Sequence, residues 1–217
     1  MRILAFAASL RRESLNRKLI TLASELARAA GAEVDLADFR EFEMPIYDGD
    51  MDATGGLPPG ALALKHRVEA ADAILIAAPE YNYSVSGALK NAIDWVSRAR
   101  PMPWRGRSVY LLSASPSPMG GIRGLWQTRI PLEGCGALVF PDMFALSHAN
   151  QAFDASGRLV DPKQAERLAK EMDGFVRLAE SLAPACAARA AGIPDERLQK
   201  LLEALESEST LQPPGRQ

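Results

Sequence analysis

The chain has 217 residues, of which 47% are apolar and 24% are charged, and its formal net charge at pH 7 is -2. A chain of this length can bury one substantial core, and length alone favours one domain over two. The small net charge gives no general electrostatic reason to bind nucleic acid or an anionic membrane, so we expect neither partner and expect any cationic site to be local.

The apolar run near the N-terminus, Ile3–Ala8, is shorter than the apolar region of about 7–15 residues that a secretion signal needs. No other segment approaches the roughly 18 apolar residues of a membrane span. The two cysteines, Cys135 and Cys186, form neither a CxxC pair nor a disulfide framework, which suits a reducing compartment. We therefore expect a cytoplasmic protein.

The first predicted strand, Arg2–Ala7, is followed by a cationic, hydroxyl-rich turn, SLRRESLN, and then by leucines at helical spacing. This turn has neither the lysine of a Walker A loop nor the glycines of GxGxxG. A helix N-terminus with free N–H groups, hydroxyls and a guanidinium suits a terminal phosphate monoester. The alternative is that Ser14 only caps the helix and that the arginines are solvated.

A second predicted strand, Glu33–Asp38, completes a βαβ unit, and residues 39–60 form a long loop or mixed segment. Connections of this length are uncommon without a function. Asp48, Asp50 and Asp52 mimic the start of an EF-hand loop, but the glycine and the bidentate glutamate of that loop are missing. We therefore expect no metal site.

The third predicted strand, Ala73–Ala78, follows a helix that starts after a Pro-Pro-Gly breaker. The loop after it reads PEYNYSVSG and leads into another helix. Tyr81 and Tyr83 offer flat apolar faces, and Asn82 with nearby backbone amides can bind the edge of a planar polar ring. The alternative is an ordinary turn whose tyrosines pack against neighbouring helices.

The fourth predicted strand, Ser108–Ser113, leads into the loop SASPSPMGGIRG and a helix through Ile130. Gly120 and Gly121 let the backbone approach a ligand closely. Alone, this is a generic loop of glycine, proline and serine.

The fifth predicted strand, Ala137–Pro141, is followed by the helix with the clearest start. Asp161 stands at its cap, Pro162 at its first position, and Gln164 where a capping box needs it. We expect the main domain to span residues 1–184. We expect residues 185–217 to form an appendage with an amphipathic helix around residues 196–205 and a frayed end.

Near-continuous apolar strands imply a sheet that is buried on both faces, with helices on each side. The expected fold is therefore α/β, a doubly wound sandwich around a five-stranded parallel sheet. Ligands of such sheets bind beyond the carboxyl ends of the strands. Residues 8–14, 79–86 and 114–121 lie there, and together they predict a phosphate pocket, a ring-edge contact and a third wall.

The segments SLRRESLN, PEYNYSVSGALKNAIDW and SPMGGIRG resemble the NADPH-dependent FMN reductases, a flavodoxin-like group that includes quinone, chromate and azo-dye reductases. The resemblance covers roughly residues 1–183 and implies the strand order 2-1-3-4-5. It implies a bound FMN. The residues that it assigns to the phosphate are Ser9, Arg11, Ser14, Leu15 and Asn16; those at the ring are Pro79, Glu80, Tyr81 and Asn82; and those on its far side include Ser115, Gly120 and Gly121.

A flavin enzyme needs no protein nucleophile, because N5 of the ring accepts and returns the hydride. The chain has two histidines and no recognisable Ser or Cys nucleophile motif. We therefore expect no catalytic side chain. NADPH or NADH would deliver a hydride, leave, and be replaced by a small electron acceptor such as a quinone, a flavin, chromate or an azo compound, in ping-pong order.

Two other functions stay open on the same fold: a non-enzymatic electron carrier of the flavodoxin type, and an interaction module. The resemblance also implies a homodimer or homotetramer. Trp95, Val96 and Trp104, with nearby arginines, suggest an apolar and cationic surface for that contact. The candidates to bind the phosphate of NADPH are Arg98, Arg100, Arg105 and Arg123, and the alternative is that these arginines are solvated.

Overall fold

The structure is a computed structural model that describes residues 1–190 and 199–200. Its centre is a parallel sheet of five strands in the order β2-β1-β3-β6-β7, which counted along the sheet strands alone is the predicted order 2-1-3-4-5. The strands are β1 (Arg2–Ala7), β2 (Glu33–Ala37), β3 (Ala73–Ala77), β6 (Ser108–Ala114) and β7 (Leu138–Leu146). The predicted α/β fold is thus confirmed.

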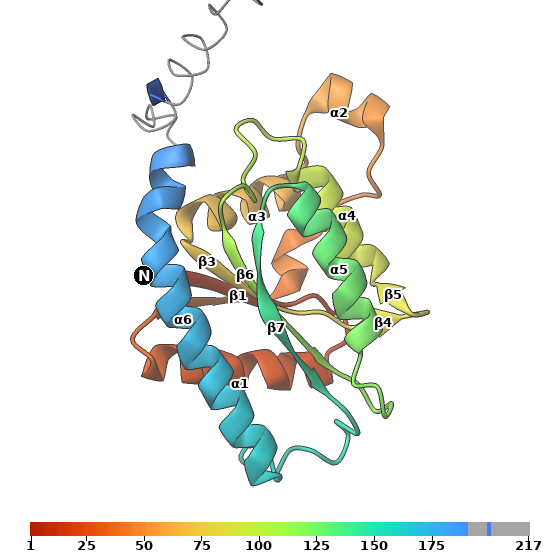
Figure 1. Cartoon of the computed structure of the whole chain (residues 1–217). Helices are drawn as coiled ribbons and strands as arrows, with labels where there is room; N and C mark the ends of the chain where they lie inside the picture. The colour runs from red at the N-terminus through yellow and green to blue at the C-terminus, as the bar shows by residue number, and fades with distance from the viewer. Residues whose placement is uncertain (191–198, 201–217) are drawn as a thin grey trace, which may run out of the picture.

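Helices cover both faces of this sheet (Figure 1). The helices α1 (Leu15–Ala29) and α6 (Pro162–Ala190) pack on one face, and α3 (Pro59–Ala70), α4 (Gly87–Val96) and α5 (Ile122–Gly134) pack on the other. Successive side chains of a strand point to opposite faces, so Ala5 joins the first core and Phe6 the second. This two-sided burial explains why the strands read as unbroken apolar runs.

The segment between β2 and α3 holds two short helices, η1 (Phe39–Phe42) and α2 (Gly49–Gly55). Phe39 stacks on Phe6 of β1 with ring centroids 5.6 Å apart, so η1 is anchored in the core. The helix α2 buries none of its residues and projects from the body of the molecule (Figure 1). The prediction of a mixed segment is therefore confirmed.

The last sheet strand is longer than predicted, and it runs to Leu146. Between the pairs Val109–Val139 and Leu111–Met143, three residues of β7 lie opposite one of β6. This bulge holds Pro141, which cannot donate a ladder hydrogen bond and is tolerated because β7 is an edge strand. The proline ended the apolar pattern in the sequence but not the strand.

The helix α6 begins as predicted, with the Asp161 carboxylate accepting the Lys163 N–H at 2.9 Å. The predicted capping box is wrong, because Oε1 of Gln164 is buried without a hydrogen-bond partner. The helix continues through Pro184, so it crosses the proposed boundary between domain and appendage, and that division stays a prediction. The helix expected around residues 196–205 lies outside the described residues, except for 199–200.

One expected surface does not exist. Trp95, Val96 and Trp104 are fully buried, and the indole N–H of Trp95 donates to the Pro45 carbonyl at 2.8 Å. Val96 and Trp104 belong to the core on this face of the sheet, and the Trp95 ring packs against Tyr47, so the three residues offer no contact for a second chain. Within the described residues, no helix is long and apolar enough to cross a membrane.

Candidate functional site

Three loops meet at the carboxyl edge of the sheet, after β1, β3 and β6. After β1 the chain enters α1 on one face, and after β3 it enters α4 on the other, so this is the point where the connections change face. Ligands of open parallel sheets bind at such a switch point. The three segments singled out from the sequence are therefore neighbours in space.

The start of α1 is left open by the protein. Ser14 is its N-cap residue, yet its side chain makes no cap hydrogen bond, although it is buried. The Ser9 hydroxyl is also buried and accepts a long bond of 3.4 Å from the Arg11 N–H. The first N–H groups of a helix have no partner within it, and they add a positive dipole end to the exposed Arg11 and Arg12. This terminus can therefore accept an anion.

The Asn16 side chain hydrogen-bonds to the protein main chain, whereas the sequence analysis assigned Asn16 to the phosphate. Its amide nitrogen donates to the Ala114 carbonyl at 3.1 Å, and its oxygen accepts the Ala114 N–H at 2.9 Å. Both polar atoms of the amide are engaged, so they tie the loop after β1 to the end of β6. A role for Asn16 in binding phosphate would use its main-chain N–H.

The short helix η1 also contacts the loop after β1, and the sequence analysis did not predict this contact. The Arg40 guanidinium, on η1, donates to the carbonyl of Leu10. The Asp38 carboxylate accepts the Arg40 N–H at 3.1 Å and pairs with Arg17 of α1, and these contacts hold the pKa of Asp38 below its ordinary value, with the Arg40 N–H the larger cause. Asp38 and Glu41 form a capping box, and that spacing was the signal in the sequence.

The second loop is a hairpin of β4 (Glu80–Tyr81) and β5 (Ser84–Val85), and it lies beside the ends of α4 and α5 (Figure 1). Its two turn residues, Asn82 and Tyr83, have φ of 50° and 66°. Positive φ at both positions is the pattern of a type I′ hairpin turn, which asparagine accepts and tyrosine rarely does. Tyr83 is 69% exposed, and the Arg123 guanidinium lies 3.9 Å from its ring centroid.

Glu80 fixes this hairpin to α5. Its side chain is only 9% exposed; one carboxylate oxygen lies 2.6 Å from the Arg123 guanidinium, and the other accepts the Gly124 N–H at 3.1 Å. The carboxylate therefore caps the start of α5, and Glu80 can meet a ligand through its main chain rather than its charge. Arg123, a candidate from the sequence to bind the phosphate of NADPH, is paired with Glu80.

The glycines of the third loop leave room for the sheet. A Cβ at Gly120 would lie 2.9 Å from main-chain atoms of Ala145 and Leu146, and one at Gly121 would lie 2.1 Å from the Ser113 hydroxyl. Both glycines also have positive φ, at 63° and 89°. Close approach to β6 and β7 thus accounts for them, and their contact with a ligand stays a prediction.

The structure therefore brings together the residues assigned to phosphate, ring edge and far wall. Ser115, in that wall, donates its N–H to the Leu146 carbonyl at 3.1 Å. Pro79 and Tyr81 flank Glu80 at the hairpin, and Tyr81 is half exposed. Within the described residues, no group of three or more His, Cys, Asp or Glu could hold a metal ion. The edge offers an anion cradle next to a rigid aromatic hairpin.

Comparison with known proteins gives concordant matches. The model of a family described as NADPH-dependent FMN reductase matches residues 1–151. An NAD(P)H-dependent FMN reductase of Pseudomonas aeruginosa is 37% identical over 182 residues, which cover 81% of this chain and 93% of that protein. A quinone reductase of Escherichia coli K12 is 31% identical over 180 residues, with the same two coverages of 81% and 93%.

Solved structures agree with these sequences. FerB, a flavoenzyme described as an NAD(P)H:(acceptor) oxidoreductase from Paracoccus denitrificans, has a TM-score of 0.72 and 31% identity, over 83% of this chain and 97% of that one. A flavodoxin from the Archaea has a TM-score of 0.54 at 9% identity, over 83% of this chain and 99% of that one, which shows the fold alone.

Proposed function

Because this chain belongs to the NADPH-dependent FMN reductase family, we propose that it holds FMN at the carboxyl edge of its sheet and passes a hydride from NADPH or NADH to a small acceptor. It is an FMN-dependent NAD(P)H oxidoreductase. FMN supplies the reversible hydride chemistry when bound. In our proposal the nicotinamide leaves before a quinone, flavin, chromate or azo acceptor takes its place, which is ping-pong order.

The open start of α1 is the observation that carries this proposal. A phosphate monoester dianion accepts several charge-assisted hydrogen bonds, and the loop after β1 offers them from hydroxyl, guanidinium and main-chain donors. We assign the phosphate to Ser9, Arg11, Ser14 and the N–H groups of Leu15 and Asn16. The Ser14 hydroxyl is buried and makes no cap bond, so it is free for a ligand.

The hairpin and the third loop position the ring in this proposal. Pro79, Tyr81 and Asn82 lie at its edge, where main-chain groups can hydrogen-bond polar ring atoms. Ser115 and the Gly120-Gly121 turn form the far wall. The Glu80 carboxylate contributes by holding the hairpin against α5, so it acts as a positioning residue. The residues offered here bind, orient and exclude water, and none acts as nucleophile.

Rapid mixing tests the proposal directly. The full chain is loaded with FMN, kept free of oxygen, and mixed with NADPH or NADH in a stopped-flow instrument. We expect the visible flavin absorbance to fall, and a small quinone added afterwards to restore it without any partner protein. Absence of bleaching with both nicotinamides would exclude the assigned reaction. Bleaching only through a separate reductase would instead indicate an electron carrier.

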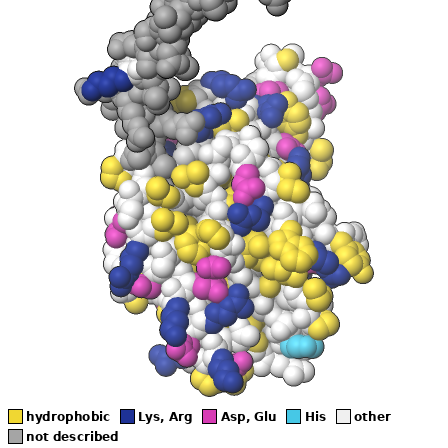
Figure 2. Space-filling model, viewed as in Figure 1, with side chains coloured by type: hydrophobic (Ala, Val, Ile, Leu, Met, Phe, Trp, Pro, Cys, Tyr) yellow, Lys and Arg dark blue, Asp and Glu magenta, His cyan; other side chains and the backbone are white. Residues whose placement is uncertain are grey.

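We also propose that the enzyme is a homodimer or homotetramer in the cytoplasm. Hydrophobic side chains gather over α5 (Figure 2), where Trp126 and Ile130 are 52% and 63% exposed. Large exposed apolar patches mark contact surfaces more often than isolated residues do. Light scattering should give a multiple of the chain mass of 23.4 kDa, and the double variant Trp126→Lys with Ile130→Lys should give a smaller species.

A further inference from the structure

The turn between β1 and α1 carries Ser9 and Arg11, which are assigned to the FMN phosphate, and a side chain from another element contacts it. The Arg40 guanidinium, on η1, donates a hydrogen bond to the carbonyl of Leu10. Among the described residues, Arg40 is the only one outside residues 9–14 whose side chain hydrogen-bonds to residues 10–13. The conformation of this turn therefore depends on a residue that the phosphate site does not include.

The contact orients one peptide group. A trans peptide is planar, so its carbonyl and its N–H point in opposite directions. The carbonyl of the peptide between Leu10 and Arg11 faces Arg40, and the N–H of the same peptide donates to the Ser9 hydroxyl at 3.4 Å. That bond is longer than ordinary N–H···O bonds, so the N–H keeps capacity for a further acceptor. Arg40 therefore directs the Arg11 N–H away from η1 and toward the assigned phosphate site.

The helix η1 gives Arg40 a fixed base. Phe39 and Phe42, its first and last residues, are both buried. A capping box at Asp38 closes its start, and the Asp38 carboxylate also pairs with Arg17 in the first turn of α1. The short helix is thus linked to the turn after β1 through Arg40 and to the following helix through Asp38.

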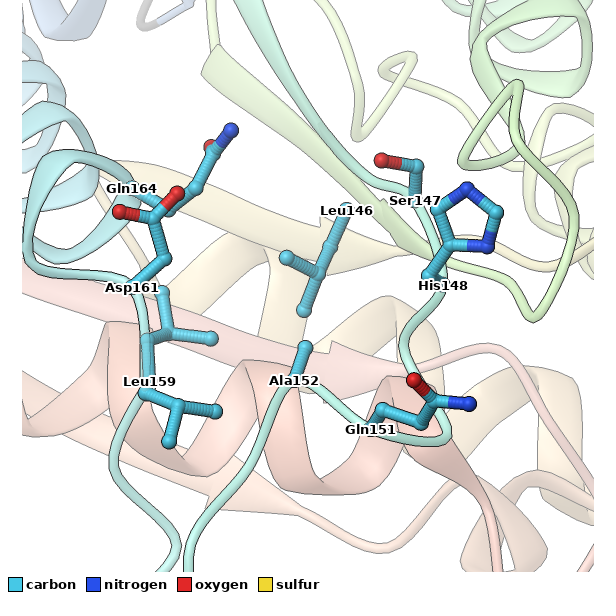
Figure 3. Close-up of a pocket in the computed structure, with 9 residues that line it drawn as sticks. Leu146, Ser147, His148, Gln151, Ala152, Leu159, Asp161 and Gln164 are labelled. Carbon is cyan, nitrogen blue, oxygen red and sulfur yellow. The ribbon is translucent and has the colours of Figure 1, made fainter.

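The third loop at this edge is held in a different way. The Ser115 N–H donates to the Leu146 carbonyl at 3.1 Å, and the His148 N–H donates to the Ser117 carbonyl at 3.3 Å. Figure 3 shows Leu146 and His148 at the end of β7 and just after it, where they also line a cavity of about 400 Å³. Main-chain bonds fix this loop whatever its side chains are, whereas the turn after β1 depends on the side chain of Arg40.

We propose that Arg40 is a positioning residue for the FMN phosphate, an inference that rests on the proposed function. Its guanidinium holds the peptide between Leu10 and Arg11 in the orientation that presents the Arg11 N–H to the phosphate. A site that is ordered before the ligand arrives binds it at a lower entropic cost. The ring contacts come from other loops, so the contribution of Arg40 is confined to the phosphate.

The variant Arg40→Met tests this role. It removes the guanidinium at similar length and keeps the main-chain N–H that Asp38 accepts. We expect FMN affinity to fall about fivefold, which is one ordinary hydrogen bond, while riboflavin affinity stays unchanged. Quenching of flavin fluorescence measures both affinities. The matched control is Arg28→Met, which removes an exposed guanidinium that donates to the Val34 carbonyl at 3.1 Å and should change neither affinity.

The possible results separate this inference from the proposed function. Unchanged FMN affinity in Arg40→Met would overturn the positioning role alone, and so would an equal loss for riboflavin, because the whole site would then depend on Arg40. A loss that disappears in about 0.5 M NaCl would also overturn it, because long-range attraction by charge is screened by salt. If the wild-type chain binds no FMN, or binds FMN and riboflavin equally, the phosphate site itself is refuted.

Discussion

Helices α1 and α4 both begin after a buried serine at the same edge of the sheet, and the two serines differ. The Ser86 hydroxyl accepts the Leu89 N–H at 3.4 Å and so caps α4. The Ser14 hydroxyl, at the same position of α1, accepts no cap bond. Two serines at the same helix position therefore differ in their cap hydrogen bonds. The protein itself therefore caps one helix start and leaves the other without a side-chain cap, as the proposed phosphate site requires.

The start of α5 is like that of α4, because a protein side chain caps it too. Its cap residue is Gly121, which has no side chain, and the Glu80 carboxylate accepts the Gly124 N–H in its place. Of the three helices that begin near the switch point, two are therefore closed by protein groups. The open one follows the turn that carries Arg11 and Arg12, so charge and unpaired donors coincide at a single terminus.

The largest expected effect is on flavin affinity at the uncapped start of α1. Riboflavin lacks the phosphate, so it should bind at least about 100-fold more weakly than FMN, a difference of about 2.8 kcal/mol. The reason is that the dianion satisfies the donors at the start of α1. Quenching of flavin fluorescence during titration measures both affinities. Equal affinities would mean that this terminus binds no phosphate.

Glu80→Ala tests a closed terminus. It leaves the Arg123 guanidinium and the Gly124 N–H without their partner, and loss of a mostly buried charged partner costs about 2 kcal/mol or more. Urea unfolding measures the loss. Glu133→Ala on the same helix removes an exposed pair with Arg129 and should cost about 0.5 kcal/mol or less. Similar losses of unfolding free energy in the two variants would contradict the role of Glu80 in holding the hairpin against α5.

The features predicted correctly from sequence are those that depend on local pattern. Apolar runs identified the sheet strands because each is buried on both faces, and Asp161 identified the start of α6 because a cap acts within one turn. The three loops followed from the order of strands alone. The local sequence determines both burial and chain geometry, so both can be predicted without a structure.

The partners of individual polar groups could not be predicted. The Asn16 amide pairs with Ala114, 98 residues away, and nothing near Asn16 signals that pairing. Tyr83 adopts a positive φ that its residue type disfavours, because the hairpin and Arg123 hold it there. Whether a polar side chain meets protein or ligand is a tertiary property. The sequence therefore predicts which loops form the candidate site, but not which of their polar groups bind to the protein itself.

A smaller effect separates the two serines. Ser86→Ala loses a cap bond and should cost about 1 kcal/mol of unfolding free energy, with unchanged FMN affinity. Ser14→Ala loses no such bond, so its stability without FMN should change by only a few tenths of a kcal/mol. Its FMN affinity should instead fall about tenfold, which is one charge-assisted hydrogen bond. Paired measurements of unfolding and FMN titration decide, and a reversed pattern would remove the distinction between the two termini.

The smallest effect concerns η1, another helix start that a protein group caps, where the Asp38 carboxylate accepts the Arg40 N–H and pairs with Arg17. These contacts lower the pKa of Asp38 in the folded state, so its charge adds stability above its unfolded pKa of about 3.9, and this stability is lost as pH falls through the lowered value. The side chain is 40% exposed and screened by solvent, so Asp38→Asn should cost only about 0.5 kcal/mol at pH 7. Urea unfolding from pH 7 downward should show this cost vanish in acid, while Ser14→Ala stays level with pH because its hydroxyl does not titrate. A cost for Asp38→Asn that persists below the pKa of the folded carboxyl would show that shape, rather than charge, closes this terminus.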